Sequence, residues 1–256
     1  MKNKKFAAFR ANGDVAKIDI DLTGAAVTVT STAEPELYIE YSKGLRPVFC
    51  ERDGAVTVKQ RGGLFAKLRR PVINVYVPEC TVPDLCIGAE RGNIYIDGGI
   101  FGDAAITGGM MSVKIDGAIF ENLRIEAAEL DVCAGGMTVK NLANTIAADG
   151  RVEIEKTFCK KAECRLKKGN IGLCGAACDF AVLNSEDGSI YANMLGSESD
   201  YTIALDAAAV SGCGNTYGGD KFIRARATKG NIVLDFEHAP RFDESEELGE
   251  YEELHA

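Results

Sequence analysis

Carboxylate side chains in the middle of the chain are the first candidates for chemistry. Asp97, Asp116 and Asp131 each begin or follow an alternation of apolar and polar residues, and Lys114 and Arg124 lie near them in the sequence. Two carboxylates, or a carboxylate with an Arg or Lys base, are the groups that cleave polysaccharides. In such alternations, however, charged residues ordinarily fill the outward positions between inward Ile and Val. We therefore expect a protein that is not an enzyme, and the alternative is a carbohydrate-binding or polysaccharide-cleaving protein.

The sequence lacks the residues and motifs that other kinds of catalysis and metal binding require. Of the two histidines, His238 follows the last predicted strand and His255 is the penultimate residue of the sequence, so no Ser-His pair is expected. The sequence contains no Gly-x-Ser-x-Gly elbow and no Walker-type phosphate loop. It contains no Cys-x-x-Cys pair either. We expect no cofactor and no metal ion.

Two tyrosines and a basic stretch are the candidates for an interaction surface. Tyr95 and Tyr191 occupy the same place in two similar units and are expected to point outward, as a glycan or protein contact or as packing on a flat sheet. The basic residues could meet phosphate, anionic lipid or the chain's own acidic tail, or stay solvated. They are Lys156, Lys160, Lys161, Arg165, Lys167 and Lys168. Neither this stretch nor a second one at residues 59–70 has the aromatic interleaving that stacks bases, so the expected partner is an unknown protein or glycan and not nucleic acid.

Nine cysteines are an odd and large number for one chain. A secreted disulfide framework ordinarily occurs in a shorter chain behind a signal peptide, so we expect reduced thiols, most of them buried as small apolar residues. Cys159 and Cys178 differ by 19 in position number and are expected to stack in neighbouring units. A disulfide between them is geometrically possible without being required.

A sequence repeat must position these residues. A glycine followed by a small polar residue and an apolar alternation occurs at residues 92–97, 169–173, 188–193 and 230–235. The intervals from Gly150 to Gly169 and from Gly169 to Gly188 are both 19, and the interval from Gly188 to Gly230 is 42, close to two units. A period near 20 with strand-type alternation is typical of a coiled β-structure.

Each unit contains a second short strand, and strands this short cannot bury their apolar sides alone. Successive coils are therefore expected to stack at roughly 4.8 Å and to share a narrow interior of Ile, Leu and Val. Glycine suits the corners because it adopts positive φ, and Asn93, Asn170 and Asn231 after it are expected to be corner residues. The predicted fold class is all-β, a single-stranded β-solenoid or β-helix of about 20-residue coils.

The pattern divides the chain into three parts. Residues 1–91 have alternating strands with longer links and are expected to form an N-terminal β capping layer, continuous with the solenoid repeats of residues 92–240. Residues 241–256 are an acidic tail, since positions 242–256 hold seven acids and no Lys or Arg. The last coil, ending at Phe236, is expected to leave an open β-edge that invites self-association unless the tail folds back over it.

Composition and hydropathy suggest a compartment. The 256 residues are 46% hydrophobic with a net charge of −9, which is enough apolar material for a packed core. The longest uncharged run, residues 207–219, is shorter than the roughly 18–20 residues of a membrane-spanning helix. The apolar stretch after the basic N-terminus is too short for a signal peptide. We expect a cytoplasmic protein, or one peripheral at the cell envelope.

The order of these segments resembles the bacterial putative-adhesin family, a domain of unknown function. The resemblance rests on residues 18–27, 73–78 and 85–94 and on the closing segment 225–234, and it covers residues 15–236. It implies a β-solenoid fold and a loose association with the bacterial envelope and envelope stress. It supplies no catalytic residues. The chain departs from many relatives in its many cysteines and in having no evident membrane helix.

Overall fold

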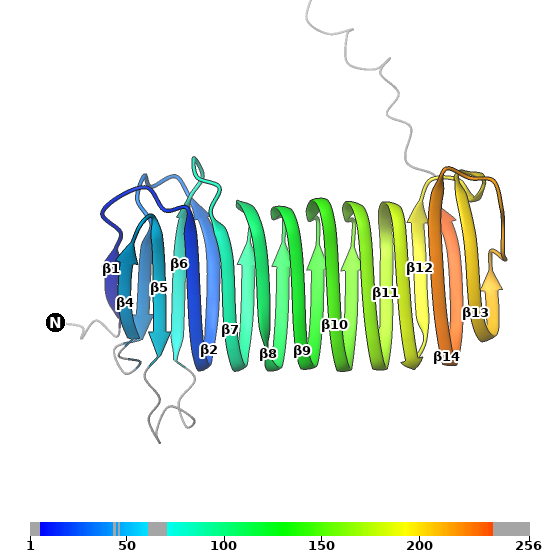
Figure 1. Ribbon diagram of the computed structural model, residues 1–256, viewed down its shortest axis with the longest axis horizontal. Coiled ribbons are helices and arrows are strands. Elements are labelled where there is room, and N and C mark those ends of the chain that lie inside the picture. Colours follow the sequence, from blue (N-terminus) through cyan, green and yellow to red (C-terminus); the bar gives the residue numbers. More distant parts are fainter. Residues whose placement is uncertain (1–5, 43–44, 46, 61–70, 238–256) are drawn as a thin grey trace, which may run out of the picture.

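The computed structural model describes residues 6–42, 45, 47–60 and 71–237, which form an elongated stack of β-coils (Figure 1). The regular secondary structure of these residues is β-strand apart from one short 3₁₀ helix, η1 (Glu198–Asp200). The expected all-β fold is confirmed. Within the same residues no helix is long and apolar enough to cross a membrane.

Long strands that wind around the molecule and pair in parallel make up the middle of the stack. They are β7 (Asp84–Asp97), β8 (Ile100–Asp116), β9 (Ile119–Gly135), β10 (Thr138–Glu155) and β11 (Phe158–Asp187). Partners on neighbouring coils, such as Ile94 and Val113, differ by 19 in position number from β7 to β9. The interval rises to 20 between β9 and β10, where a bulge between Val139 and Leu142 takes up the extra residue. The repeat in the sequence is therefore one coil of the fold.

Each coil has two long sides, named here face A and face B. In β8, face A contains residues 103–107 and face B contains residues 112–116, and the residues in register with them on other coils complete each face. Ile106, Val113 and Ile115 are buried, whereas Thr107 and Lys114 between them are exposed. The same alternation recurs on every coil, so the inward side chains stack in columns and form one continuous core. A short segment, residues 100–101 in β8, leads from face B of one coil to face A of the next.

The corner between faces A and B explains why glycine recurs. Gly169 has a φ of 123°, and a Cβ on it would lie 1.6 Å from the carbonyl oxygen of Gly150. A Cβ on Gly188 would lie 1.9 Å from the carbonyl oxygen of Gly169. A side chain at either position would push neighbouring coils apart, so these corners require glycine. Asn170 also lies at this corner, as expected, and its Oδ1 accepts a hydrogen bond from the Ser189 N–H (2.8 Å).

A mixed layer forms the N-terminal end of the stack. β2 (Lys17–Thr32) pairs in parallel with β7, and on its other side it pairs in parallel with β5 (Ala55–Gln60) and β6 (Val72–Pro78). The remaining strands of the layer pair antiparallel; they are β1 (Phe6–Arg10), β3 (Tyr38–Ser42) and β4 (Pro47–Arg52). β1 and β4 were not predicted, and neither contains a buried residue that would mark it. The predicted boundary at residue 91 falls inside β7, and the division into cap and solenoid remains a prediction.

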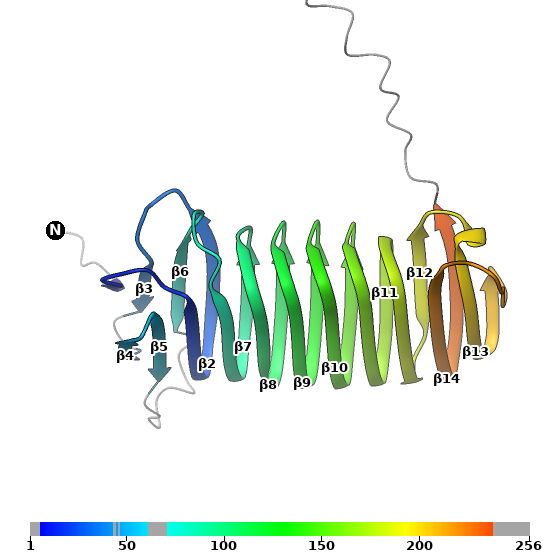
Figure 2. The ribbon, with the colours of Figure 1, turned by 45° about the horizontal axis from the view of Figure 1, so that its top comes forward.

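The C-terminal end departs from a simple stack. β12 (Ile190–Leu195), β13 (Tyr201–Gly212) and β14 (Lys221–Glu237) follow in sequence, but β14 lies between β12 and β13 (Figure 2). Ile190 pairs directly with Ile232, the equivalent position of the unit that begins at Gly230. The expectation that this interval spans two stacked units is therefore wrong, because the chain between them runs past the position of β14 and then returns.

The end strand of the stack is consequently β13 and not the coil that ends at Phe236. The open edge expected after Phe236 belongs to β13, where an antiparallel bridge between Ile203 and Thr216 covers one part of it. The acidic tail at residues 241–256, both histidines and the basic residues from 61 to 70 lie outside the described residues.

Candidate functional site

The carboxylates that could cleave a polysaccharide are not gathered in one place. Asp97 and Asp116 are register partners on face B, but Gly135 takes the next position in their column. Asp131 lies in a different column of the same face. Arg124 lies on face A, where it is ion-paired with a glutamate of its own strand at 2.6 Å. Asp97 and Asp116 are therefore neighbours, about one strand spacing apart, whereas Asp131 and Arg124 lie elsewhere, so the full set does not converge on one point.

Both candidate tyrosines point outward from face B, as expected. They share one column, in which they are separated by Lys114, Cys133, Glu153 and Gly172. Five steps of about 4.8 Å place the tyrosines roughly 24 Å apart, so they do not form one aromatic contact. Lys114 Nζ lies 5.2 Å from the centroid of the Tyr95 ring. Tyr191 is 51% exposed, which makes it the tyrosine available to a partner.

An open depression of about 250 Å³ lies beside Tyr191 on face B. Gly172 forms its floor, because it stands between Glu153 and Tyr191 in the column and has no side chain to fill the space. Carboxylates from two strands line it, namely Glu153 and Glu155 from β10 and Asp235 from β14. The depression is thus a gap in an otherwise continuous row of side chains.

Asn193 in the same depression carries an unsatisfied polar atom. Its Nδ2 donates a hydrogen bond to Glu237 Oε2 (3.2 Å). Its Oδ1 is buried and has no hydrogen-bond partner among the described residues. A buried acceptor without a partner is costly, so a donor from a bound group would be favourable there.

The depression is acidic, and so is the face that contains it. From β7 to β14, with β13 included, face B carries six acids and two bases, whereas face A carries five acids and five bases. Arg151 forms an ion pair with Glu153. No ion pair of the described residues involves Glu155 or Asp235. An exposed tyrosine ring beside such carboxylates suits a cationic group.

The basic stretch at residues 156–168 does not form one patch. Lys156 lies in a turn with a φ of 47°, Lys161 and Arg165 lie on face A, and Lys168 lies at the corner before face B. Glu163 forms ion pairs with both Lys161 and Arg165, at 2.6 and 3.4 Å. The stretch follows the circumference of a single coil, so its charge is dispersed and partly neutralised.

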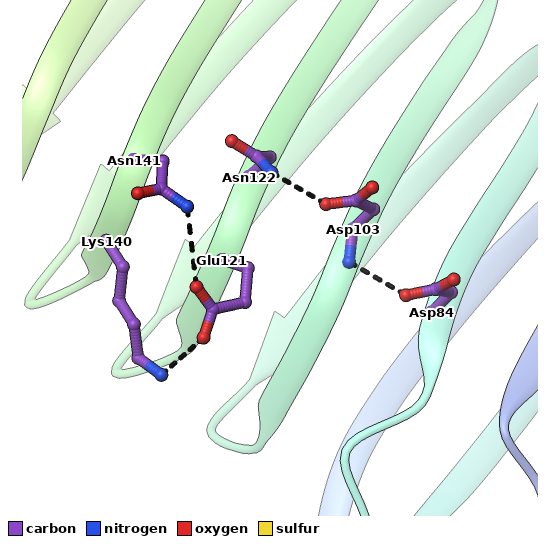
Figure 3. Close-up of polar contacts among 6 residues, drawn as sticks. All are labelled: Asp84, Asp103, Glu121, Asn122, Lys140 and Asn141. Atoms are coloured by element: carbon purple, nitrogen blue, oxygen red, sulfur yellow. Dashed lines mark hydrogen bonds and ion pairs between the residues drawn. The ribbon is translucent and has the colours of Figure 1, made fainter.

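A ladder of polar contacts joins neighbouring coils at the corner before face A (Figure 3). Its members are Asp84, Asp103, Glu121, Asn122, Lys140 and Asn141. The Asp103 N–H donates to Asp84 Oδ1 (2.9 Å), and Asn122 Nδ2 donates to Asp103 Oδ1 (2.7 Å). Lys140 Nζ donates to Glu121 Oε1 at 2.5 Å. Since each of these carboxylates is bonded to the next coil, the ladder holds the coils in register.

Neither the ladder nor the depression is predicted from the sequence, although both follow the period of the coils. Asp84 and Asp103 are separated by one such period, and so are Gly172 and Tyr191. The sequence signal for both features is the 19-residue spacing of polar residues and of one glycine outside the corner motif. This spacing becomes visible only when the sequence is aligned with itself at the period of one coil.

The cysteines are less buried than expected. Cys159, Cys164 and Cys178 are buried, but four of the nine are exposed. The expectation of mostly buried thiols is wrong, because strand alternation turns residues such as Cys133 and Cys174 outward on face B. Cys159 and Cys178 stack on adjacent coils as expected, with their Sγ atoms 2.9 Å apart.

Comparisons with known proteins found a family model and several solved structures similar to this chain. A family model described as Toastrack DUF4097 matches residues 15–217. A putative adhesin from Bacteroides fragilis has a crystal structure that aligns with 14% identity over 92% of this chain and 98% of its own, with a TM-score of 0.53. A putative adhesin from Parabacteroides distasonis aligns with 14% identity over 91% of this chain and 98% of its own, with a TM-score of 0.37. A putative lipid binding protein from the same species aligns with 13% identity over 90% of this chain and 97% of its own, with a TM-score of 0.38. No curated protein matches the chain.

Proposed function

The chain belongs to the Toastrack DUF4097 family, and we propose that it is a non-enzymatic binding protein that recognises a basic partner through face B. The resemblance to the putative-adhesin family noted in the sequence is confirmed. The family match ends at residue 217, so the closing segment 225–234 lies beyond it.

The observation that supports this proposal is the open depression over Gly172. It combines a half-exposed aromatic ring, an acceptor without a partner and carboxylates on an acidic face. Lys or Arg side chains of a partner protein fit this set, since Glu155 and Asp235, three coil steps or roughly 14 Å apart, can each meet one charge while a stem packs on the Tyr191 ring. Dispersed charges and a flat sheet favour binding over turnover, and no finding favours the carbohydrate alternative.

The place of this binding is part of the same proposal. The Bacteroides fragilis relative is described as a putative adhesin, and we extend a role in binding at the bacterial envelope to this chain. The proposed location is tested by fractionating the native cells and detecting the protein in each fraction with an antibody against the chain. We expect the protein in the envelope fraction, released by high salt, because contacts between exposed charges are screened by salt.

A basic peptide tests the binding site. Fluorescein-labelled octa-arginine is titrated into the full chain at low ionic strength, and fluorescence anisotropy gives the affinity. Gly172→Leu fills the floor of the depression and is expected to weaken binding by about tenfold, or roughly 1.4 kcal/mol. Glu155→Gln and Asp235→Asn are each expected to weaken it by up to about fivefold, as for exposed charge pairs.

Gly88→Leu is the matched control. Gly88 lies on face A, away from the depression, and a Cβ on it would meet its nearest atom, Asp21 Oδ1, at 3.7 Å. This variant is expected to bind the peptide as the natural chain does. Equal affinity of Gly172→Leu and the natural chain would show that the depression is not the site. Saturable binding of a neutral chitin hexasaccharide, lost in Gly172→Leu and without peptide binding, would support the carbohydrate alternative instead.

A further inference from the structure

Two buried cysteines lie next to each other outside the proposed binding site. Cys159 and Cys178 point inward from neighbouring coils, in the short segment that leads from face B to face A. They continue an inward column that begins with Phe101, Phe120 and Val139. The Ala177 N–H donates to the Thr157 carbonyl oxygen (2.9 Å), which holds the two backbone segments side by side.

The geometry brings the two sulfur atoms close to bonding distance. Their separation of 2.9 Å is less than about 1 Å longer than the roughly 2.05 Å of a disulfide. Neighbouring strands of a sheet lie about 4.8 Å apart, which is within the Cα separations of about 4.4–6.8 Å that disulfides span. One end is fixed further, because Tyr201 Oη donates a hydrogen bond to the Cys178 carbonyl oxygen (3.2 Å). The bond can therefore form without movement of the coils.

We propose that Cys159 and Cys178 are a modification site, at which an oxidant of the peroxide class forms a disulfide between two adjacent coils. Such a bond joins equivalent positions of neighbouring coils, so it closes one complete coil into a ring. The coil that it closes leads directly into the part of β11 that pairs with β14. Oxidation therefore reinforces the stack just before the strand that the chain inserts out of order.

The reaction divides into two balanced steps. The Cys159 thiolate attacks one oxygen of hydrogen peroxide, the O–O bond breaks, and the hydroxide that leaves takes up the proton that Cys159 had released, so that Cys159 becomes a sulfenic acid and one water forms. The Cys178 sulfur then attacks the Cys159 sulfur, the S–S bond forms, and hydroxide leaves with the Cys178 proton as a second water. Two thiols lose two electrons in total, and the peroxide gains them.

Cys159 is the first nucleophile in this scheme. It is 9% exposed against 3% for Cys178, so the oxidant reaches it more readily. The hydrogen bond from Cys178 lowers the pKa of Cys159, and the same hydrogen bond, together with burial, raises the pKa of Cys178. The thiolate is the reactive form of a cysteine, which favours the same order.

Mapping of the thiols tests the proposal on the full chain. The protein is reduced, freed of reductant, treated with hydrogen peroxide, denatured and alkylated. We expect seven alkylated cysteines after oxidation against nine before it. Digestion with trypsin and a protease that cleaves before Asp is expected to release residues 157–160 joined to residues 169–178. The oxidised protein is also expected to melt roughly 6–12 °C higher, and a reductant should reverse the shift.

Two variants make the assignment specific. Cys174→Ser leaves Cys178 as the single thiol of residues 169–178 and is expected to lose two thiols on oxidation, as the natural chain does. Cys178→Ser is expected to lose the crosslink and the rise in melting temperature. The proposal is wrong if Cys159 and Cys178 both remain alkylatable while other thiols oxidise, or if either one bridges to a different cysteine.

Discussion

Burial decides what individual ionisable residues can do in this protein. Cys164 lies in an inward column of face A, in register with Thr145, and is 3% exposed. Burial raises the pKa of its thiol to about 12. The thiol therefore stays protonated in the folded chain at pH values where an unfolded chain ionises it.

This difference predicts a loss of stability in alkali. The unfolded thiol releases its proton near pH 8.5, so between about pH 9 and 12 the unfolded state binds fewer protons and the free energy of unfolding falls as pH rises. Cys164→Val removes the ionisable group and is expected to reduce this fall by on the order of 1 kcal/mol per pH unit. Urea denaturation at a series of pH values measures it.

The exposed Cys133 provides the control for this measurement. Cys133→Val is expected to keep the pH dependence of the natural chain, since its side chain is solvated in both states. Tyr201, whose pKa burial also raises to about 12, is present in both variants and contributes equally. The same slope in Cys164→Val and the natural chain would contradict the prediction.

At this scale the sequence predicts the direction of side chains better than their neighbours. The alternation of period two correctly placed Tyr95 and Tyr191 outward, and the spacing of one coil correctly stacked Cys159 on Cys178. The depression at Gly172 was missed, because it depends on which residues occupy the adjacent coils. Such contacts follow from register, which no local pattern contains.

At the scale of elements, two glycines of the same coil have opposite roles, which provides a sharp test. Gly169 lies at the corner against the Gly150 carbonyl, whereas a Cβ on Gly172 would meet its nearest atom, Glu153 Cγ, at 3.6 Å. Gly169→Ala is expected to lower the free energy of unfolding by about 1–3 kcal/mol or more, through strain and displaced backbone. Gly172→Ala is expected to change it by less than about 1 kcal/mol. Urea denaturation compares the two, and equal losses would mean that close packing at the corner does not specify the coil.

The elements themselves were predictable where apolar and polar residues alternate, in β2, β3, β5 and β6 of the N-terminal layer as well as in the repeats. Recurring glycines and apolar alternation predict the coils from β7 to β11, and the structure confirms these coils. The short strands β1 and β4 lack buried residues, so they have no such signal. The order of β13 and β14 was also beyond prediction, because periodicity gives the length of a coil and not the position in which a strand is inserted.

At the scale of the whole molecule, the stack has two faces of different charge and two ends of different construction. Face B is acidic, and face A is balanced. The N-terminal end is a mixed layer, whereas the C-terminal end is β13, whose second half is exposed and includes Val210 at 43% exposure. We propose that any self-association of the chain uses this half of β13, since no described strand other than β14 pairs with it.

The insertion of β14 predicts how the C-terminal end depends on it. β13 pairs with no other strand of the described chain, and each coil of a solenoid is stabilised mainly by its neighbours. Truncation after Asp220 removes β14 and is expected to abolish the amide protection of β13 while β8 to β10 keep theirs. Hydrogen exchange with mass spectrometry measures this, and truncation after Glu237, which retains β14, is the control and is expected to leave β13 protected. Protection of β13 in the shorter chain would contradict the prediction. It would mean that β13 can pair with β12 in the position that β14 occupies in the full chain, and so does not need β14 for its stability.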